Sequence, residues 1–502
     1  MLLRDLVATS TAVAGTRSRL QKRRHLAEAL RGAHPDDVDA VATFLAGGIR
    51  QRRTGVGWRT LADLPAPAAE ATLTAAAVDA ALERMAWLSG PGSQEERVRE
   101  VRALFAAATA PEQQLLRGLI SGEVRQGALD ALLLEAIAEA AEVPVSLVRR
   151  AAMFSAATGP VAAAALRGGR GALAAFGLVV GRPVRPMLAA SAPDLDGALV
   201  GLPGEVAVDG KIDGIRIQVH RSGDDVAVFT RSLDDITARL PEVVEVALGL
   251  PARAVVLDGE AIALAPDGRP RPFQETGARA MSRDAGLRDT VPLTPLFFDI
   301  LHLDGVDLID APARRRFDVL EGVVPAGARA PRVVTAEPAV AREFNARMIA
   351  LGHEGVVVKD LAAPYDAGRR GAAWVKVKPR LTLDLVVLAV EWGSGRRRGL
   401  LSNIHLGARS GDGFAMVGKT FKGMTDEMLA RQTARFLELE ARREGHVVHL
   451  RPEQVVEVAL DGVQRSSRYP GGVALRFARV LRYRDDKSAA EADTLDTVRA
   501  LA

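Results

Sequence analysis

The hydrophobic pattern of this 502-residue chain changes near Gly177. Before that point, apolar residues recur at helical spacing in a sequence rich in Ala, Leu, Glu and Arg, and strand-like alternation is nearly missing. Beyond the Gly- and Pro-punctuated segment 177–189, short runs alternate as in β-strands, with short helical stretches between them. A single core seldom organises so long a chain. The pattern therefore predicts an all-helical domain followed by separate domains that contain sheets.

The β-rich part divides again near Pro379. The segment "DLVVLAVEWGSG" (384–395) opens a region of short strands and Gly-rich turns, in which one helix is expected over 424–443. A small, basic, β-rich module of this size suits an OB-fold barrel. We therefore expect a multidomain protein, with an all-α domain at 1–177, an α+β domain at 178–380 and an all-β OB-fold domain at 381–502.

Two capping-box patterns mark helix starts in the first region. Ser93 precedes Glu96 by three residues, and Thr109 precedes Glu112 by the same spacing. In this motif the hydroxyl and the carboxylate each satisfy a backbone N–H of the first helical turn. We therefore expect helices to begin at both sites.

Composition excludes several kinds of site. The chain has no cysteine, which excludes disulfides, thiolate nucleophiles and cysteine-ligated zinc. No apolar run approaches the roughly 20 residues that span a bilayer, and Arg4 and Asp5 interrupt any signal sequence. The formal net charge is +4, with basic residues concentrated in 17–24, 395–399 and 465–487. We expect a cytoplasmic protein without a membrane partner, and the basic clusters agree with a nucleic-acid partner or with ordinary solvated faces.

The segment "VDGKIDGIRIQVHR" (208–221) is predicted to form a β-hairpin, since apolar alternation flanks a turn that contains Gly210 and Gly214. Glycines at such a turn allow a ligand to approach the backbone closely. The turn also carries Lys211, and a lysine amine becomes a nucleophile when burial or a nearby cation lowers its pKa. Arg216 on the outgoing strand offers a planar fork for a phosphate. An ordinary turn would show the same pattern, so this segment alone leaves both interpretations open.

The string K-x-D-G-x-R at 211–216 resembles motif I of the covalent nucleotidyltransferases, the superfamily of DNA ligases, RNA ligases and mRNA capping enzymes. Six further segments resemble the other motifs of that superfamily, in the same order. They are "TRSLDDIT" (230–237), "VLDGEAI" (256–262), "LFFDILHLDG" (296–305), "EGVVVKD" (354–360), "RRGAAWVKVK" (369–378) and "RFARVLRYRDDK" (476–487). Each segment alone could be an ordinary strand, but the ordered set indicates the superfamily.

The N-terminal region distinguishes among these families. "LLRGLISGEVRQGALDALLLEAI" (115–137) resembles a segment of the DNA-binding domain of three-domain ATP-dependent DNA ligases, with Arg117, Arg125 and Gly127 in matching positions. "RPVRPMLA" (182–189) resembles the start of the adenylation domain of these ligases. The NAD-dependent branch carries cysteine-ligated zinc, which this chain cannot form. Over essentially its whole length, the chain resembles a three-domain ATP-dependent DNA ligase with a helical DNA-binding domain, an adenylation (nucleotidyltransferase) domain and an OB-fold domain.

The resemblance implies roles for the matching residues. Lys211 would take AMP from ATP, Phe298 would stack on the adenine, and Asp209, where many relatives have Glu, would accept a hydrogen bond from the adenine amino group. Glu260 and Glu354 would hold Mg²⁺, or Mn²⁺ in its place, with the ribose as an alternative partner of Glu260. The other nucleotide contacts would be the basic residues Arg216, Arg231, Arg370, Lys376, Lys378, Arg484 and Lys487, and the DNA contacts would be Arg117, Arg125 and Gly127.

The resemblance also implies a function. The enzyme would seal nicks in duplex DNA through a lysyl-AMP intermediate and a DNA adenylate, as a monomer that encircles DNA during replication, repair or recombination. Its location would be cytoplasmic, at the nucleoid in a bacterial cell. The third domain would close over ATP about a hinge near 380–384. Two alternatives stay open: an RNA ligase or capping-type nucleotidyltransferase, and a catalytically inactive DNA-binding scaffold.

Overall fold

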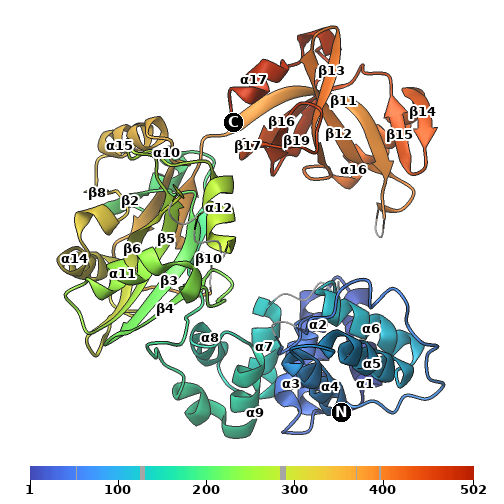
Figure 1. Ribbon diagram of the computed structural model, residues 1–502, viewed down its shortest axis with the longest axis vertical. Helices are drawn as coiled ribbons and strands as arrows, with labels where there is room; N and C mark the ends of the chain where they lie inside the picture. The colour runs from blue at the N-terminus through green and yellow to red at the C-terminus, as the bar shows by residue number, and fades with distance from the viewer. Residues whose placement is uncertain (52–53, 125–129, 283–285, 287–289, 369, 395–396) are drawn as a thin grey trace.

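The computed structural model describes residues 1–51, 54–124, 130–282, 286, 290–368, 370–394 and 397–502. The chain forms a helical body, a mixed α/β body and a β-rich body in sequence order (Figure 1). The helical and β-rich bodies extend from the middle body toward the same side, so that the three together have the outline of a C. Among the described residues, no helix combines the length and the apolar character that crossing a bilayer requires.

The first body packs its helices around one apolar core. The helices are α1 (Leu3–Gly15), α2 (Arg19–Arg31), α3 (Val38–Leu45), α4 (Ala75–Trp87), α5 (Ser93–Ala106), α6 (Ala110–Ser121), α7 (Asp130–Ala140), α8 (Val145–Met153) and α9 (Gly159–Ala174). Their helical spacing places Leu26, Leu82 and Phe105 on inward faces, where they are fully buried. Arg23 of α2 forms an ion pair with Glu139 of α7 at 2.6 Å. Part of the basic cluster at 17–24 therefore holds two helices together.

One of the two capping-box predictions is confirmed. The carboxylate of Glu112 accepts hydrogen bonds from the backbone N–H and the hydroxyl of Thr109, each at 2.8 Å. A helix also begins at Ser93, but the capping box predicted there is wrong, because the N-cap of α5 is Gly92, which has a left-handed φ of 81°. Ser93 is already inside the helix, and the carboxylate of Glu96 forms an ion pair with Arg99 instead.

The middle body contains two facing sheets. Its strands are β1 (Leu188–Ser191), β2 (Val206–Gly210), β3 (Ile215–Ser222), β4 (Asp225–Thr230), β5 (Ala254–Ala263), β6 (Leu293–Leu303), β7 (Val306–Asp307), β8 (Arg332–Thr335), β9 (Val356–Asp360) and β10 (Arg370–Val377). Its helical segments are α10 (Leu195–Val200), η1 (Thr237–Arg239), α11 (Pro241–Leu248), α12 (Phe273–Met281), α14 (Ala313–Val323), η2 (Ala326–Ala328) and α15 (Pro338–Ala350). In the described part of this body, the first sheet has the order β1-β10-β9-β2-β8 and the second the order β4-β3-β5-β6-β7. All neighbours are antiparallel except β1 and β10, which are parallel.

Helices cover the outer faces of the two sheets. Residues of α10 and α15 pack on the first sheet, where Phe344 shares a core with Val206. Residues of α11 and α14 pack on the second sheet, where Leu320 shares a core with Ile217. A further apolar cluster joins the inner faces of both sheets and includes Trp374 of β10 and Val256 of β5. This cluster also contains Met153 and Phe154 at the end of α8, so the helical body packs directly against the middle body.

The predicted hairpin at 208–221 does not form. β2 lies in the first sheet between β9 and β8, whereas β3 lies in the second sheet between β4 and β5. Residues 211–214 therefore carry the chain from one sheet to the other. The alternating pattern identified both strands, but a period of two does not specify their partners. A Cβ on Gly214 would lie 2.6 Å from the carbonyl oxygen of Ala261, so close packing against β5, rather than ligand approach, requires this glycine.

The third body is built on a curved sheet around its own apolar core. Its strands are β11 (Leu381–Trp392), β12 (Leu401–Ser410), β13 (Gly413–Thr420), β14 (Glu440–Glu444), β15 (Val447–Leu450), β16 (Val455–Leu460), β17 (Gly462–Arg465), β18 (Val473–Arg476) and β19 (Arg479–Tyr483), and its helical segments are α16 (Asp426–Glu438), η4 (Ala489–Glu491) and α17 (Leu495–Arg499). β11 pairs with β12 on one side and with β16 and then β15 on the other. The helix expected over 424–443 ends earlier, because Glu440–Glu444 pairs with β15.

Candidate functional site

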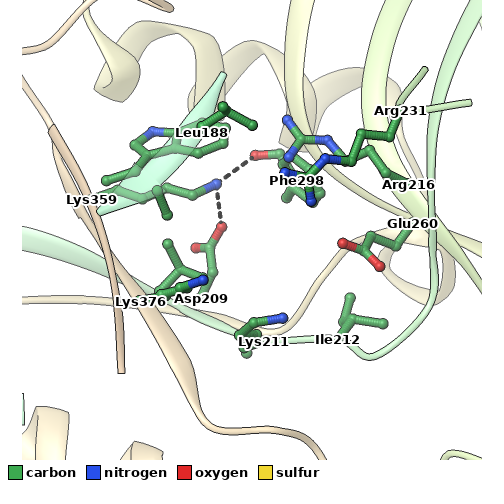
Figure 2. A pocket seen from close by; sticks show the side chains of 14 residues that line it. Leu188, Asp209, Lys211, Ile212, Arg216, Arg231, Glu260, Phe298, Lys359 and Lys376 are labelled. Atoms are coloured by element: carbon green, nitrogen blue, oxygen red, sulfur yellow. Dashed lines mark hydrogen bonds and ion pairs between the residues drawn. The ribbon is translucent and has the colours of Figure 1, made fainter. Parts of the chain in front are cut away.

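A pocket lies between the two sheets of the middle body (Figure 2). It is lined by Leu188, Ala189, Asp209, Gly210, Lys211, Ile212, Arg216, Arg231, Glu260, Phe298, Val357, Lys359, Trp374 and Lys376. Strands of both sheets contribute to it, since Asp209 is on β2 and Glu260 is on β5. Apolar and aromatic side chains therefore adjoin a set of charged ones, which is an arrangement suited to a flat ring that carries an anionic tail.

Lys211 lies in the segment that crosses between the sheets, and its backbone is bound to the start of β9. Its N–H donates to the carbonyl of Gly355 at 2.8 Å, and its carbonyl accepts from the N–H of Glu354 at 3.0 Å. Gly355 has a φ of +121°, and a Cβ there would lie 2.3 Å from the carbonyl oxygen of Val377. The backbone is therefore held in place, while the side chain of Lys211, 19% exposed, reaches the pocket.

The carboxylate of Glu354 lies between two lysines. Its Oε2 is 2.6 Å from Nζ of Lys211, and its Oε1 accepts a hydrogen bond from Nζ of Lys378 at 2.7 Å. Burial opposes ionisation of this carboxyl, but the Lys211 and Lys378 cations outweigh it, so the pKa of Glu354 lies below its ordinary value. Glu354 is therefore an anion beside the candidate nucleophile.

Glu260 on β5 faces the same pocket, but its pKa is shifted in the opposite direction from that of Glu354. Its Oε2 accepts a hydrogen bond from the N–H of Gly214 at 3.0 Å. Burial raises the pKa of Glu260 to about 7, although the charges of Lys211 and Arg216 act in the opposite direction. At neutral pH Glu354 is therefore ionised whereas Glu260 is partly protonated, and a bound cation would favour the ionised form of Glu260.

Asp209 is buried between two cations. Nε and Nη2 of Arg332 on β8 donate to its two oxygens at 2.6 and 2.8 Å, and Nζ of Lys359 on β9 lies 2.6 Å from Oδ2. Burial opposes ionisation of Asp209, but these two cations outweigh it, so its pKa lies below the ordinary value. The strand neighbours of β2 therefore supply the charge partners of the residue that was expected to contact adenine.

Phe298 on β6 and Trp374 on β10 form an aromatic wall, with ring centroids 5.8 Å apart and planes at 84°. The guanidinium of Arg216 lies 4.9 Å from the centroid of Phe298 and donates to both oxygens of Asp258 at 2.8 and 2.6 Å. Tyr365 donates to the same carboxylate at 2.6 Å. Arg216 is therefore held against the aromatic wall, and its predicted phosphate contact stays a prediction.

The other nucleotide-binding candidates of the middle body divide between two hollows. Arg231 and Lys376 line the pocket of Lys211. Lys378 lines an adjoining hollow between the middle and third bodies, which Lys376 also borders. Arg370 begins β10, and its side chain lies outside the described part of the structure.

Arg484 and Lys487 do not reach the pocket in this arrangement. Nη1 of Arg484 and Nζ of Lys487 donate to Oδ2 of Asp384 at 2.8 and 2.6 Å. Asp384 belongs to β11, in the segment where a hinge was expected. Both cations are therefore bound within the third body, and the position expected for them near ATP would require them to leave Asp384.

Of the three candidate DNA-binding residues, the structure describes Arg117. Arg117 is exposed on α6. Arg125 and Gly127 fall in 125–129, outside the described residues. Their predicted contacts with DNA stay predictions.

Sequence reasoning overlooked several residues of the site. Lys359 and Trp374 stood inside segments already matched to the family, and a search for buried charge or aromatic residues in those segments would have found them. Asp258 also stood in a matched segment, at 256–262, whereas Arg332 carried no local signal, because it acts through Asp209, which is distant in sequence.

Comparisons with known proteins agree over the whole chain. Three family models match it: "DNA ligase N terminus" over residues 63–138, "ATP dependent DNA ligase domain" over 186–378 and "ATP dependent DNA ligase C terminal region" over 397–487. A probable DNA ligase from Beutenbergia cavernae is 64% identical over 512 residues, which cover 100% of each chain. A probable DNA ligase from Mycolicibacterium gilvum is 55% identical over 507 residues, covering 100% of this chain and 99% of that one. A solved structure named Pmar-Lig_PreS3 has a similar fold, with a TM-score of 0.62 and 17% identity over 95% of this chain and 99% of the other. The matches do not favour an RNA ligase, a capping enzyme or an inactive scaffold.

Proposed function

The chain belongs to the ATP-dependent DNA ligases, and from that membership we propose that it seals nicks in duplex DNA through an adenylate carried on Lys211. The observation that carries the proposal is the position of Lys211 at the crossover between the two sheets, with its amine 2.6 Å from Glu354 and in one pocket with Glu260 and Phe298. An amine, two carboxylates and an aromatic wall around one pocket support this proposal.

In the proposed reaction, AMP passes from ATP to Lys211 and then to the 5′-phosphate of the nick, and it leaves when the strand is sealed. The deprotonated amine of Lys211 attacks the α-phosphorus of ATP, which forms a P–N bond and releases pyrophosphate as the α–β bond breaks. An oxygen of the 5′-phosphate at the nick then attacks that phosphorus, which breaks the P–N bond and restores the amine. Finally the 3′-hydroxyl loses its proton and attacks the 5′-phosphorus, and AMP leaves. Arg231 and Lys376, which line the pocket, are the proposed partners of the phosphate oxygens.

The donor set near Lys211 fits a magnesium ion. Mg²⁺ is usually held by one or two carboxylates together with substrate phosphates, and Glu260 and Glu354 are two such carboxylates. Among the described residues no group of three or more His, Cys, Asp and Glu side chains gathers as a metal site, which agrees with a cation held partly by ATP. When bound, Mg²⁺, or Mn²⁺ in its place, would neutralise phosphate charge. Glu260 alternatively binds the ribose.

We assign the third body as an OB-fold domain that closes over ATP. Support comes from its curved sheet and from the position of Asp384, which binds Arg484 and Lys487 at the start of β11. Rotation about residues 380–384 would bring these two cations toward the β- and γ-phosphates.

Nicked duplex DNA is the proposed partner, bound by a monomer. The first and third bodies extend to the same side of the middle body (Figure 1), which suits enclosure of a duplex. In this assignment Arg117, Arg125 and Gly127 contact phosphates beside the nick. Such an enzyme would act in the cytoplasm, at the nucleoid in a bacterium.

Incubation with α-labelled ATP tests the proposal. Label should survive denaturation of the wild-type protein, and pyrophosphate added before denaturation should release it as ATP. The native labelled protein should seal nicked DNA better than nicked RNA. Absence of label on the wild-type protein, with active ligase as a positive control, would contradict the function.

A further inference from the structure

We propose that Asp384 is a positioning residue that competes with the triphosphate of ATP for Arg484 and Lys487. Its carboxylate holds both cations within the third body, and each cation exchanges this partner for a phosphate oxygen when ATP is bound. The inference rests on the proposed closure of the third body over ATP. It assigns a role to a residue that lies outside the motif segments of the sequence.

One oxygen of Asp384 binds both cations. Oδ2 accepts from Nη1 of Arg484 at 2.8 Å and from Nζ of Lys487 at 2.6 Å. The other oxygen, Oδ1, is buried and has no hydrogen-bond partner among the described residues. A buried oxygen without a partner costs folding free energy. The position of this carboxylate therefore serves the two cations at the expense of its own hydrogen bonding.

The remaining nitrogens of Arg484 are occupied as well. Nε and Nη2 donate to the two oxygens of Asp486 at 2.8 and 2.7 Å. Asp486 lies in the same turn as Arg484 and moves with it, whereas Asp384 belongs to β11. Two cations and two carboxylates give this group no net charge that would attract a triphosphate. ATP therefore has to displace a carboxylate, and Asp384 is the one that ties both cations to the sheet.

Other contacts hold this end of the chain without the two ion pairs. The backbone N–H of Arg484 donates to the carbonyl of Val455 at 2.9 Å. The N–H of Asp493 donates to the carbonyl of Asp384 at 2.8 Å, and its Oδ2 accepts from the N–H of Asp384 at 2.7 Å. Ala492 shares a buried apolar cluster with Val455. Replacing the Asp384 carboxylate therefore leaves the backbone and packing contacts in place.

Competition by Asp384 affects both directions of the first step. A ligand that must displace an existing partner binds with reduced apparent affinity, so ATP binds more weakly than it would to free cations. The same competition acts on pyrophosphate after the P–N bond has formed. Asp384 then takes the cations back, which favours loss of the leaving group. The carboxylate therefore exchanges ATP affinity for release of pyrophosphate.

The experiment uses the full-length protein and measures self-adenylation from α-labelled ATP over a range of ATP concentrations. Asp384→Asn keeps the size of the side chain and removes its charge. The half-saturating ATP concentration should fall about fivefold, which is the equivalent of the roughly 1 kcal/mol that a partly exposed ion pair contributes. Asp384→Glu, which keeps the charge, should return this concentration toward the wild-type value.

The reverse reaction gives a second measurement. Pyrophosphate attacks the phosphorus of the lysyl adenylate, which breaks the P–N bond, re-forms ATP and restores the amine of Lys211. The pyrophosphate concentration that gives half the maximal rate of label loss should fall by a similar factor in Asp384→Asn. A purely structural role of Asp384 would not strengthen the binding of both ligands.

Glu457→Gln provides a matched control. Glu457 on β16 is the register partner of Asp384 on β11, and it forms an ion pair with Arg482 at 2.6 Å. Its replacement changes the net charge by the same amount, and the half-saturating ATP concentration should stay at the wild-type value. In a protein that already carries Arg484→Ala and Lys487→Ala, Asp384→Asn should have no further effect, because the cations that it would release are absent.

Three results would overturn the inference: an unchanged or raised half-saturating ATP concentration in Asp384→Asn, an equal fall in Glu457→Gln, or a fall that persists without the two cations. Asp384→Ser removes the same charge with a smaller side chain and repeats the test, so a folding defect of one variant does not decide it. A wild-type protein that took no label from ATP would contradict the proposed function itself. Normal labelling of the wild type with no change in Asp384→Asn would contradict the role of Asp384 alone.

Discussion

Nη1 of Arg476 and Oδ2 of Asp213 lie 2.9 Å apart, and this ion pair connects the third body to the segment that carries Lys211. A second contact lies beside it, since Nε2 of Gln274 donates to the carbonyl of Arg465 at 3.0 Å. The third body therefore docks near Lys211 through the side chain of Arg476 and the carbonyl of Arg465. The proposed triphosphate ligands of the third body, Arg484 and Lys487, remain bound to its own β11.

Arg476→Ala is expected to weaken this docking. A partly exposed ion pair contributes about 1 kcal/mol or less, so the variant should keep its Tm and show a larger radius of gyration in small-angle scattering. Arg451→Ala is the control, because it removes an ion pair with Glu453 within the third body. An Arg476→Ala scattering profile identical to that of the wild type would contradict a docking role.

Lys211→Ala is expected to abolish self-adenylation, because the pocket then lacks the amine that forms the P–N bond. Sealing of a pre-adenylated nick should persist at a reduced rate, since that step depends on positioning and charge rather than on this amine. Label transfer from α-labelled ATP and gel-based sealing measure the two steps. Stable labelling of the variant would show that another residue is the nucleophile.

Glu260→Gln is expected to remove a pH-dependent loss of stability. The pKa of Glu260 is raised from 4.5 to about 7, so the folded protein keeps a proton that the unfolded chain releases at lower pH. Stability from this group is complete below the unfolded pKa and is lost as pH rises through the folded pKa. The wild-type Tm minus the variant Tm should thus fall from about pH 5 to about pH 7.5. A constant difference would contradict the raised pKa.

The double variant Arg484→Ala with Lys487→Ala tests domain closure. If these cations leave Asp384 to align the β- and γ-phosphates, the variant should slow adenylation by about 10-fold or more, as loss of a charge-stabilising donor does. Sealing of a pre-adenylated nick should be affected far less. Arg482→Ala, which removes an ion pair with Glu457 on β16, serves as the control. A double variant with a normal adenylation rate and weakened DNA binding would contradict domain closure and would show that these cations bind the DNA backbone instead.

Arg117→Glu tests the helical body as a DNA-binding surface. A point variant is preferable to removing residues 1–177, because Met153 and Phe154 share a core with Trp374. Affinity for nicked DNA should fall, and the slope of log affinity against log salt should decrease by about 1 for each lost phosphate contact. Adenylation of Lys211 should be unchanged. Equal effects of Arg117→Glu and Arg4→Glu, which changes an exposed arginine of α1, would show that general charge, not this position, is responsible.

The sequence alone was sufficient for features that depend on near neighbours in the chain. Helical spacing predicted the first body, and short alternating runs predicted the strands on both sides of Lys211. The Thr109 capping box formed as expected, since its partners are three residues apart. The ordered motifs indicated the ligase family and selected Lys211, Glu260 and Phe298, which the structure brings into one pocket.

The tertiary structure decided which of these elements meet. An alternating strand does not encode its partner, so β2 and β3 entered different sheets and Lys211 became the crossing point between them. Arg332 and Lys359 reach Asp209 only because β8 and β9 flank β2. The pKa of Glu260 depends on desolvation between two sheets. The orientation of the third body depends on a few partly exposed contacts, such as Arg476 with Asp213. These quantities arise from residues that are distant in sequence, so no local pattern could contain them.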